Sequence, residues 1–571
     1  MTSEVTRAAS YDFDAIVVGS GVTGGWAAKE LTAQGLKVLM LERGKPVVHG
    51  KDYVTEHMPA WKMPLRDLPD RALYASDYPV QRHARGFDST TLRFWNNDRE
   101  NPYVQEPGRP YNWFRANVVG GKSLLWGRHT YRWSDLDFEA NRRDGHGNDW
   151  PIRYADIKDW YSYVERFIGV SGQAEGLAHL PDGEFLPPME LNVVEKAFKS
   201  GVEKHFPGRC VTIGRVANLT RPLGERAACH YCGPCQRGCS VGAYFSTQSS
   251  TLPAAQASGL LTLRPNSVVE SLAYDPVTHR VSAVQVIDAD TKARHRYTAR
   301  MVFLCASTFA SLQILLNSRS TGAPSGLANS SGTLGRYVMD HYHGGGAVAT
   351  MPGFTGKYYY GNRPNTLYLP RFRNLTAGGE AGVDFLRGYC YQGIGYPGEW
   401  ETTWQEIPGF GAQFKEKLRR PGDWHLFLLG FGECLPYKDN RVVLDEKRDR
   451  FGIPQLRFDI TYRDNERRLG VDMTNQAAAM LAAAGGTSIK RFDEVFTPGT
   501  SIHEFGGARM GNDPRESVLN EHNQAHDVSN LFVTDGSCMS STSCVNPSLT
   551  FMALTARAVK YAVEQAKTRA I

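Results

Sequence analysis

The chain has 571 residues, of which 41% are hydrophobic and 22% charged, so it is long enough for two large domains or one elaborated unit around a buried core. Its net charge of +6 is small for this length and no Lys/Arg run is present, which argues against nucleic-acid binding. No stretch approaches the ~20 apolar residues of a membrane span, the first residues do not resemble a signal peptide, and the ten cysteines do not resemble a secreted disulfide framework.

The first predicted element is a dinucleotide-binding turn near the N-terminus. Residues 13–18 have the composition of a buried parallel strand, the run Gly-Ser-Gly-Val-Thr-Gly follows at 19–24, and residues 25–34 favour a helix. Such a run lets the backbone approach a pyrophosphate at the helix N-terminus. A second strand at 37–41 leads to Glu42, whose carboxylate would accept hydrogen bonds from a ribose. The predicted cofactor contacts, which do not distinguish FAD from NAD, are Gly19, Gly21, Val22, Thr23, Gly24, Glu42 and Arg43.

The segments that follow are less regular. Residues 50–110 are rich in Pro, Asp, Arg and aromatic residues, which indicates a long excursion over the surface. At 114–127 a short apolar run precedes paired glycines, a pattern that suits backbone lying against a flat ligand. Residues 156–168 have helical periodicity. The paired-glycine segment adds Gly120, Gly121, Ser123 and Leu124 to the candidate cofactor contacts.

Four cysteines crowd into residues 229–239, where Cys229, Cys232, Cys235 and Cys239 have C-x2-C-x2-C-x3-C spacing. Glycine and proline turns in such a run let the backbone wrap around a cluster and aim each thiolate inward. Structural zinc usually takes two separated pairs of ligands. The spacing therefore predicts an iron–sulfur cluster and one-electron transfer, with zinc, disulfides and free thiols as alternatives.

The second half of the chain is predicted to contain further strands of two kinds. Residues 262–305 favour a β-meander that closes with a buried strand at 301–305, and a helix follows at 308–316. The aromatic-rich segment 345–490, with an alternating strand at 424–428, is assigned to a separate antiparallel sheet carrying the substrate pocket. Candidate stacking partners for a sugar ring, with core packing as the alternative, are Tyr358, Tyr359, Tyr360 and Trp400.

Three motifs near the C-terminus indicate a family. Residues 501–511 read Ser-Ile-His-Glu-Phe-Gly-Gly-Ala-Arg-Met-Gly, residues 530–537 read Asn-Leu-Phe-Val-Thr-Asp-Gly-Ser, and residues 545–550 read Val-Asn-Pro-Ser-Leu-Thr. Together with the N-terminal turn, they make the chain resemble the glucose–methanol–choline (GMC) family of FAD oxidoreductases. The resemblance implies an α/β fold in which a Rossmann-like FAD-binding domain is interleaved with an α+β substrate domain built on an antiparallel sheet. The expected FAD-binding segments are 8–135, 225–340 and 495–571, with the iron–sulfur segment at 226–245, and the expected substrate-binding segments are 136–224 and 341–494.

The same resemblance implies roles at an active site. His503 is the expected catalytic base, and Asn546 is its expected partner. A neutral imidazole can take the proton of a hydroxyl group while hydride leaves the carbon. Asn546 followed by Pro547 is also a good helix start, so capping is a second expectation for Asn546. The resemblance completes the expected FAD contacts with Val268, Asp535, Gly536, Asn546, Pro547 and Ser548.

FAD is expected to bind non-covalently. Some family members carry a histidine directly before the tryptophan of the paired-glycine region and attach FAD through it. Here Leu125 precedes Trp126, and His129 lies three residues later.

The cysteine run makes the chain look like the flavoprotein subunits of bacterial sugar dehydrogenase complexes. The resemblance implies oxidation of a sugar or glycoside hydroxyl, with electrons leaving through an iron–sulfur cluster to a cytochrome c subunit, and it slightly favours a three-iron over a four-iron cluster. Residues 120–141 resemble those of glucoside 3-dehydrogenase flavoproteins more than those of the glucose or fructose enzymes, and this resemblance favours oxidation at C3 of a glucoside. A small partner subunit would carry the export signal, so a periplasmic protein attached to the membrane through its partners is expected, with a cytoplasmic location as the alternative. The alternative functions are an oxidase that uses dioxygen, an FAD-containing lyase and an electron carrier.

Overall fold

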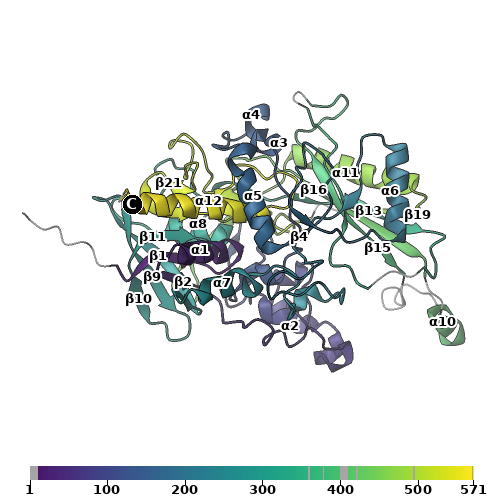
Figure 1. Ribbon diagram of the computed structural model, residues 1–571, viewed down its shortest axis with the longest axis horizontal. Coiled ribbons are helices and arrows are strands. Elements are labelled where there is room, and N and C mark those ends of the chain that lie inside the picture. Colours follow the sequence, from purple (N-terminus) through teal and green to yellow (C-terminus); the bar gives the residue numbers. More distant parts are fainter. Residues whose placement is uncertain are drawn as a thin grey trace, which may run out of the picture.

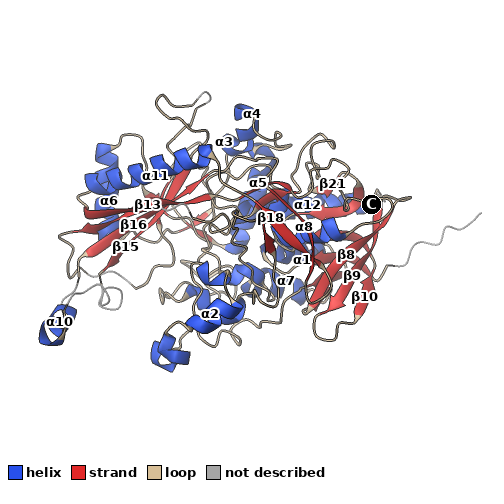
Figure 2. Cartoon of the chain, turned by 180° about the vertical axis from the view of Figure 1, so that it is seen from behind, coloured by secondary structure: helices blue, strands red, loops and turns tan. Residues whose placement is uncertain are grey.

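The computed structural model describes residues 11–357, 361–376, 379–398, 409–419, 422–492, 496–568 and 570–571. The predicted stacking residues Tyr358, Tyr359, Tyr360 and Trp400 lie outside the described residues. Two regions of sheet and helix lie side by side, one containing α1 and α12 and the other containing β13, β15 and β16 (Figures 1 and 2). Among the described residues, no helix combines the length and the apolar character needed to cross a membrane. The predicted mixed α/β architecture is confirmed.

A six-stranded sheet forms the first region, in the order β21-β22-β11-β1-β2-β7. Its strands pair in parallel, except for β21, which pairs with β22 in the antiparallel sense. The central strands are almost entirely buried, as expected for parallel strands covered on both faces. The strands are β1 (Phe13–Val18), β2 (Val38–Leu41), β7 (Leu261–Arg264), β11 (Ala299–Leu304), β21 (Gln524–Ala525) and β22 (Val528–Val533).

Helices from both ends of the chain pack together on this sheet. Helix α1 (Val22–Ala33) contacts α12 (Ser548–Lys567), and α12 also contacts α5 (Tyr154–Ile168) (Figure 1). Helix α1 begins three residues before the predicted start, directly after Gly21, so the first N–H groups of the helix lie within the glycine turn. Helix α8 (Thr308–Asn317) follows β11, and α7 is Thr251–Ala257.

The predicted meander at 262–305 is only partly correct. Strands β8 (Ser267–Asp275), β9 (Arg280–Asp288) and β10 (Arg294–Tyr297) form a separate three-stranded antiparallel sheet. Strands β7 and β11 on either side of it instead join the parallel sheet. Alternation along the sequence does not reveal this difference, because a strand's partner depends on the fold of the whole chain.

The second large sheet is fully antiparallel, in the order β19-β13-β16-β15-β14-β6. Helix α11 (Asp464–Ala483) packs on β13, β16 and β19, and α6 (Val193–His205) packs on β15 and β16. The predicted strand at 424–428 is part of β16. The strands are β6 (Thr212–Ile213), β13 (Tyr342–Met351), β14 (Leu367–Leu369), β15 (Tyr389–Pro397), β16 (Trp424–Gly432) and β19 (Thr487–Phe492).

A five-stranded sheet, β20-β12-β17-β18-β3, joins strands from both predicted domains. Strand β12 (Arg336–Met339) pairs with β20 (Phe505–Gly507), which brings the residues after β12 close to those before β20. His341 and His503 lie in these two places. The other strands are β3 (Val104–Gln105), β17 (Arg441–Arg448) and β18 (Pro454–Asp459). The remaining elements include β4 (Val170–Ser171), β5 (Phe185–Leu186), α2 (Arg71–Asp77), α3 (Asp135–Phe138), α4 (Ala140–Asp144) and α10 (Gly411–Leu418).

Candidate active site

A cavity of about 590 Å³ runs between the glycine turn and the residues that precede β20 and α12. Segments from the N-terminus, the paired-glycine region and the C-terminus all contribute to its wall. The predicted cofactor contacts that line it are Gly19, Gly21, Val22, Thr23, Glu42, Arg43, Gly121, Ser123, Val268, Asp535, Gly536, Asn546, Pro547 and Ser548.

Three predicted contacts do not line the cavity but support its wall. A Cβ atom on Gly24 would lie 1.9 Å from the carbonyl oxygen of Gly19, so Gly24 allows α1 to pack closely on the turn. The backbone N–H of Gly120 donates to Ser20 Oγ at 2.9 Å. The side chain of Leu124 is buried in a small core with Tyr53.

The glycine turn leaves room for a phosphate group at the start of α1. A Cβ atom on Gly21 would have nothing within 4 Å, although Gly21 lines the cavity and directly precedes the helix. Backbone N–H groups at a helix N-terminus bind anions, and the absence of a side chain lets the anion approach them. These residues therefore fit the pyrophosphate of a dinucleotide.

Glu42 lies directly after β2, and its carboxylate already accepts hydrogen bonds from neighbouring residues. Its Oε2 accepts hydrogen bonds from Ser20 N at 3.0 Å and Ser20 Oγ at 2.5 Å, and its Oε1 accepts one from Gly44 N at 2.7 Å. A carboxylate has about four acceptor positions, so Oε1 retains capacity for one ribose hydroxyl. Burial raises the pKa of Glu42, and these hydrogen bonds oppose that rise. Arg43 binds Asn101 and Asp449, which holds its side chain at the same end of the cavity.

His503 and Asn546, the two residues expected to act as a pair, are neighbours on the cavity wall. Nδ2 of Asn546 lies 3.2 Å from Nε2 of His503, and Oδ1 of Asn546 accepts a hydrogen bond from Gln392 Nε2 at 2.7 Å. The opposite nitrogen of His503, Nδ1, lies 2.9 Å from Nδ1 of His341. Burial, followed by the nearby His341, lowers the pKa of His503 well below its usual value, so its ring is neutral at pH 7.

The expected capping role of Asn546 is wrong. Helix α12 begins at Ser548, Pro547 occupies the N-cap position, and no side chain caps the helix. The side chain of Asn546 instead forms hydrogen bonds with His503 and Gln392. Its contacts are therefore those of a site residue, and the helix start keeps unpaired N–H groups next to the cavity.

Asp340 braces the loop that carries His503. Its carboxylate accepts hydrogen bonds from Gly499 N at 2.7 Å and from Ser501 Oγ, and Ser501 Oγ accepts one from His503 N at 3.2 Å. Burial raises the pKa of Asp340 to about 7. The sequence analysis did not identify Asp340, His341 or Gln392. The closely spaced His341 and His343, one just before β13 and one within it, are the one local signal that could have drawn attention to this region.

The predicted metal ligands Cys229, Cys232, Cys235 and Cys239 are free thiols. Among the described residues, which include all four, no group of three or more His, Cys, Asp or Glu side chains is arranged to hold a metal ion. The thiols still lie within electrostatic range of one another. Burial is the main cause that raises the pKa of Cys229 to about 11; the backbone N–H of Tyr231 lowers it, and the thiols of Cys235, Cys232 and Cys239 raise it further. As arranged, these residues do not fit a metal or a cluster. Cys235 lines the large cavity, so the run adjoins the candidate active site.

His129 also lines the cavity, but both of its ring nitrogens have hydroxyl partners. Nδ1 lies 3.1 Å from the hydroxyl of Tyr131, and Nε2 lies 3.4 Å from Oγ1 of Thr366. Burial lowers the pKa of His129 to about 3. These contacts hold the ring in the wall of the cavity.

Family models described as "GMC oxidoreductase" match residues 13–343 and 436–555. The chain belongs to the GMC oxidoreductase family. Membership implies FAD as the cofactor, and the open glycine turn and the accepting Glu42 Oε1 fit its pyrophosphate and ribose. This GMC oxidoreductase is thus an enzyme, and the predicted family and fold are confirmed.

Relatives of this GMC oxidoreductase carry several names. The chain is 28% identical to 2-methyl-1,2-propanediol dehydrogenase of Mycolicibacterium austroafricanum, over 96% of this chain and 94% of that protein. It is 26% identical to the fructose dehydrogenase large subunit of Gluconobacter japonicus, over 95% and 96% of the two chains. It is 28% identical to paromamine 6'-oxidase of Streptomyces fradiae, over 96% and 91%. The crystal structure of pyridoxine 4-oxidase from Mesorbium loti shares the fold, with a TM-score of 0.59 and 16% identity over 96% and 99% of the two chains.

Proposed function

We propose that this GMC oxidoreductase is an FAD-dependent dehydrogenase that oxidises a hydroxyl group of a sugar or glycoside. The observation that carries the proposal is the position of the His503–Asn546 pair, which shares one cavity with the open glycine turn at Gly21. A proton acceptor and a dinucleotide site within one cavity suit the removal of a proton and a hydride from the same alcohol.

The proton leaves the substrate hydroxyl for Nε2 of His503. The ring is neutral because burial lowers its pKa, so a lone pair is available at pH 7. Nδ2 of Asn546 carries two N–H groups; one faces His503, and the other can donate to the substrate oxygen. The two side chains together hold the hydroxyl oxygen and orient the carbon that loses hydride. FAD, when bound, accepts that hydride.

FAD is proposed to be held by the turn at Gly19–Gly21 and by Glu42. The pyrophosphate would lie over Gly21, where a Cβ atom would have no neighbour within 4 Å, and a ribose hydroxyl would donate to Oε1 of Glu42. Binding is proposed to be non-covalent, because both ring nitrogens of His129 already have partners.

A polyol substrate is supported by the polar groups around the pair. Gln392, His343 and Thr366 line the cavity and offer donors or acceptors for further hydroxyls. The relatives include proteins named for fructose and for a propanediol. We propose a glucoside as the substrate and its C3 hydroxyl as the one oxidised, because residues 120–141 resemble those of glucoside 3-dehydrogenase flavoproteins.

Anaerobic mixing of the purified protein with a panel of glucosides, free sugars and simple diols tests this proposal. We expect the flavin absorbance to bleach most rapidly with a glucoside, and product analysis to place the new carbonyl at C3. If only the diols bleach the flavin, the substrate is a simple alcohol and not a sugar. If no alcohol bleaches the flavin, the dehydrogenase function is wrong.

An oxidase is the second candidate, because one relative is named as an oxidase. The two functions differ in what reoxidises the reduced enzyme. Rapid reoxidation by an artificial dye and slow reoxidation by air support the dehydrogenase. Rapid reoxidation by air, with hydrogen peroxide as the product, supports the oxidase instead.

The finer proposal concerns electron export. We propose that residues 226–245 close around an iron–sulfur cluster, three-iron in preference to four-iron, once iron and sulfide are supplied. Three features support it: four free thiols lie within electrostatic range, Gly233 and Gly238 have the positive φ angles of tight turns (97° and 111°), and Cys235 adjoins the cavity. Because the thiols as arranged do not fit a cluster, we derive no step of the reaction through it.

Iron and acid-labile sulfide analysis of anaerobically purified protein tests the cluster. We expect about three iron atoms per flavin and an electron paramagnetic resonance signal in the oxidised state. Cys239→Ser should lose iron but keep flavin reduction by substrate, with Cys210→Ser, outside the run, as the matched control. Purified protein that contains a full complement of flavin but no iron would contradict the proposed cluster.

We also propose a cytochrome c acceptor subunit, a small subunit that carries the export signal, and a periplasmic location at the membrane, with the cytoplasm as the alternative. The relative named as a large subunit supports assembly with at least one other chain. Affinity purification from the native host should recover a haem-containing chain that the reduced enzyme reduces. Recovery of the chain alone from the cytoplasm would contradict the complex.

A further inference from the structure

His341 lies directly behind His503. Its Nδ1 lies 2.9 Å from Nδ1 of His503, and its Nε2 lies 3.2 Å from the carbonyl oxygen of Thr542. The side chain of His341 is fully buried and does not line the cavity. Any effect of His341 on a substrate must therefore pass through His503.

The carbonyl of Thr542 determines where His341 carries its proton. A carbonyl oxygen only accepts hydrogen bonds, so Nε2 of His341 bears the hydrogen. Burial lowers the pKa of His341 to about 4, so the ring is neutral near pH 7 and has a single N–H group. Nδ1 of His341 is then an acceptor, and the hydrogen between the two rings belongs to Nδ1 of His503.

Contacts on the other side of His503 lead to the same assignment. Gln392 Nε2 donates to Oδ1 of Asn546 at 2.7 Å, which turns Nδ2 of Asn546 toward His503. Nδ2 of an amide only donates, so Nε2 of His503 accepts and carries no hydrogen. Two independent sets of contacts thus require one tautomer of His503.

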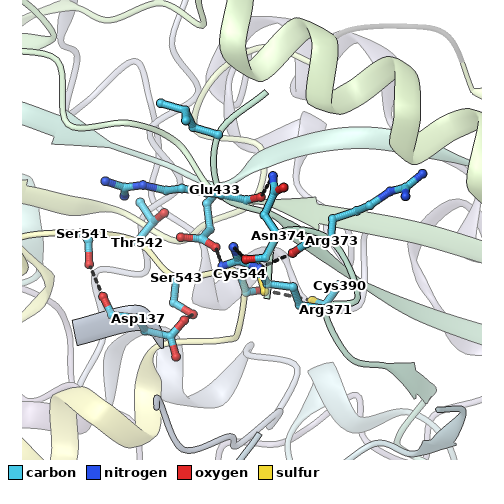
Figure 3. Close-up of polar contacts among 12 residues, drawn as sticks. Asp137, Arg371, Arg373, Asn374, Cys390, Glu433, Ser541, Thr542, Ser543 and Cys544 are labelled. Atoms are coloured by element: carbon cyan, nitrogen blue, oxygen red, sulfur yellow. Dashed lines mark hydrogen bonds and ion pairs between the residues drawn. The ribbon is translucent and has the colours of Figure 1, made fainter. Parts of the chain in front are cut away.

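The Thr542 carbonyl belongs to a buried segment whose neighbouring residues are hydrogen-bonded on both sides. The hydroxyl of Ser543 donates to Asp137 Oδ1 at 2.6 Å, and Ser541 donates to the Asp137 carbonyl at 3.4 Å (Figure 3). Cys390 Sγ donates to the carbonyl of Cys544 at 3.0 Å, as Figure 3 also shows. These contacts on both sides of Thr542 keep its carbonyl directed at His341.

We propose that His341 is a positioning residue that fixes His503 as the Nδ1–H tautomer, so that Nε2 carries a lone pair that can take the substrate proton when the hydroxyl group replaces the N–H of Asn546 as its partner. The inference rests on the proposed role of His503 as the base. In the other tautomer, Nε2 would carry a hydrogen and could not take the hydroxyl proton. The carbonyl of Thr542, His341, His503, Asn546 and Gln392 thus form one hydrogen-bonded chain with a single direction.

The tautomer can be measured directly, without substrate. In protein labelled with [15N]histidine, the Nδ1 and Nε2 resonances of His503 are identified by their loss in His503→Ala. We expect a protonated Nδ1 and an unprotonated Nε2 at pH 7. A protonated Nε2 in the unmodified protein would overturn the inference, whatever the variants of His341 show. The proposed dehydrogenase function is tested separately, by flavin bleaching.

Variants of His341 test its role. His341→Leu removes the hydrogen-bond acceptor for Nδ1 of His503. We expect flavin reduction to slow by about tenfold or more, up to the 10²–10⁴-fold loss that a missing base would cause. We also expect a larger fraction of His503 to carry its hydrogen on Nε2. His341→Asn places an amide oxygen near the former Nδ1, so it should recover most of the rate and the Nδ1–H tautomer. His526→Leu, which removes a half-buried histidine bonded to Ser517 outside the cavity, is the matched control and should leave both readouts unchanged.

Two outcomes would overturn the role of His341. One is flavin reduction in His341→Leu within about threefold of the unmodified enzyme, with no change in tautomer. The other is an equal loss of rate in His341→Leu and His341→Asn with the Nδ1–H tautomer retained in both, which would mean that His341 only fills space.

Discussion

A Cβ atom on Gly24 would lie 1.9 Å from the carbonyl oxygen of Gly19, whereas a Cβ atom on Gly21 would have no neighbour within 4 Å. The two glycines of one turn therefore have different reasons to be glycine. Gly24 lets α1 pack closely on the turn, and Gly21 keeps open a position on the cavity wall where a ligand would lie.

Alanine at these two positions should have different effects. Gly24→Ala forces a methyl group into backbone, so we expect a loss of at least about 1–3 kcal/mol of unfolding free energy. Gly21→Ala should leave the free energy of unfolding of the flavin-free protein nearly unchanged, because φ is −67° there, but weaken FAD binding. Thermal unfolding and flavin titration of the two variants distinguish these effects. Equal FAD affinity in Gly21→Ala and the unmodified protein would place the pyrophosphate elsewhere.

His503→Ala should retain bound FAD and lose flavin reduction by about 10²–10⁴-fold, the usual size of a general-base contribution. The reason is that Nε2 of His503 is the proposed proton acceptor on the cavity wall. Stopped-flow reduction under anaerobic conditions measures the rate. His526→Ala should behave as the unmodified enzyme, and near-normal reduction in His503→Ala would remove His503 from the base role.

Asn546→Ala should slow flavin reduction more than it lowers stability. The variant loses the hydrogen bonds to His503 and Gln392, each worth about 0.5–1.5 kcal/mol. It also loses the N–H that would hold the substrate oxygen during proton transfer. Reduction rate and thermal unfolding are measured on the same preparation. A purely structural role would lower the unfolding temperature while the folded fraction reduced its flavin at the normal rate.

The pH dependence of flavin reduction should follow His503. Its pKa in the folded protein is lowered below 6.5, chiefly by burial, and only the neutral ring accepts a proton. Protonation therefore removes activity as the pH falls, but only below pH 6.5, and the rate constant should be level from there to pH 8. Anaerobic reduction from pH 5 to 8 at saturating substrate measures this. A fall in the rate constant with a midpoint above pH 6.5 would contradict the lowered pKa of His503.

Denaturation with acid should release all the yellow flavin into the supernatant. Leu125 stands where a histidine would form the covalent link, and both ring nitrogens of His129 contact the hydroxyl groups of Tyr131 and Thr366. Absorbance and fluorescence of the supernatant and the washed pellet measure the two fractions. If flavin stays with the polypeptide, His129→Asn becomes the next variant to examine.

Local sequence patterns predicted the parts of the site that depend on neighbours along the chain. The turn at Gly19–Gly24 lies between a short apolar run, predicted as a buried strand, and a segment of helical composition, so its conformation follows from a few adjacent residues. His503 and Asn546 were found through motifs, since neither has a distinctive local pattern. The capping role of Asn546 was wrong, because the exact start of α12 decides which residue caps it, and Pro547 occupies that position.

The cysteine run shows where spacing stops being informative. It predicts four thiols close together, and Cys229 does lie within electrostatic range of the other three. Spacing does not decide whether they converge tightly enough for a metal, because that depends on turns such as those at Gly233 and Gly238. In the described structure, they do not converge in that way.

The sequence by itself determined the family, the dinucleotide turn and the identity of His503 and Asn546, because each of these is encoded within short segments. Only the tertiary structure decided what surrounds them. His341 lies 162 residues before His503 in the chain, and the pairing of β12 with β20 brings the two rings within 2.9 Å. Gln392 reaches Asn546 from a different sheet, across 154 residues. Contacts of this kind depend on which strands pair and how helices pack, which are properties of the whole chain rather than of any one segment.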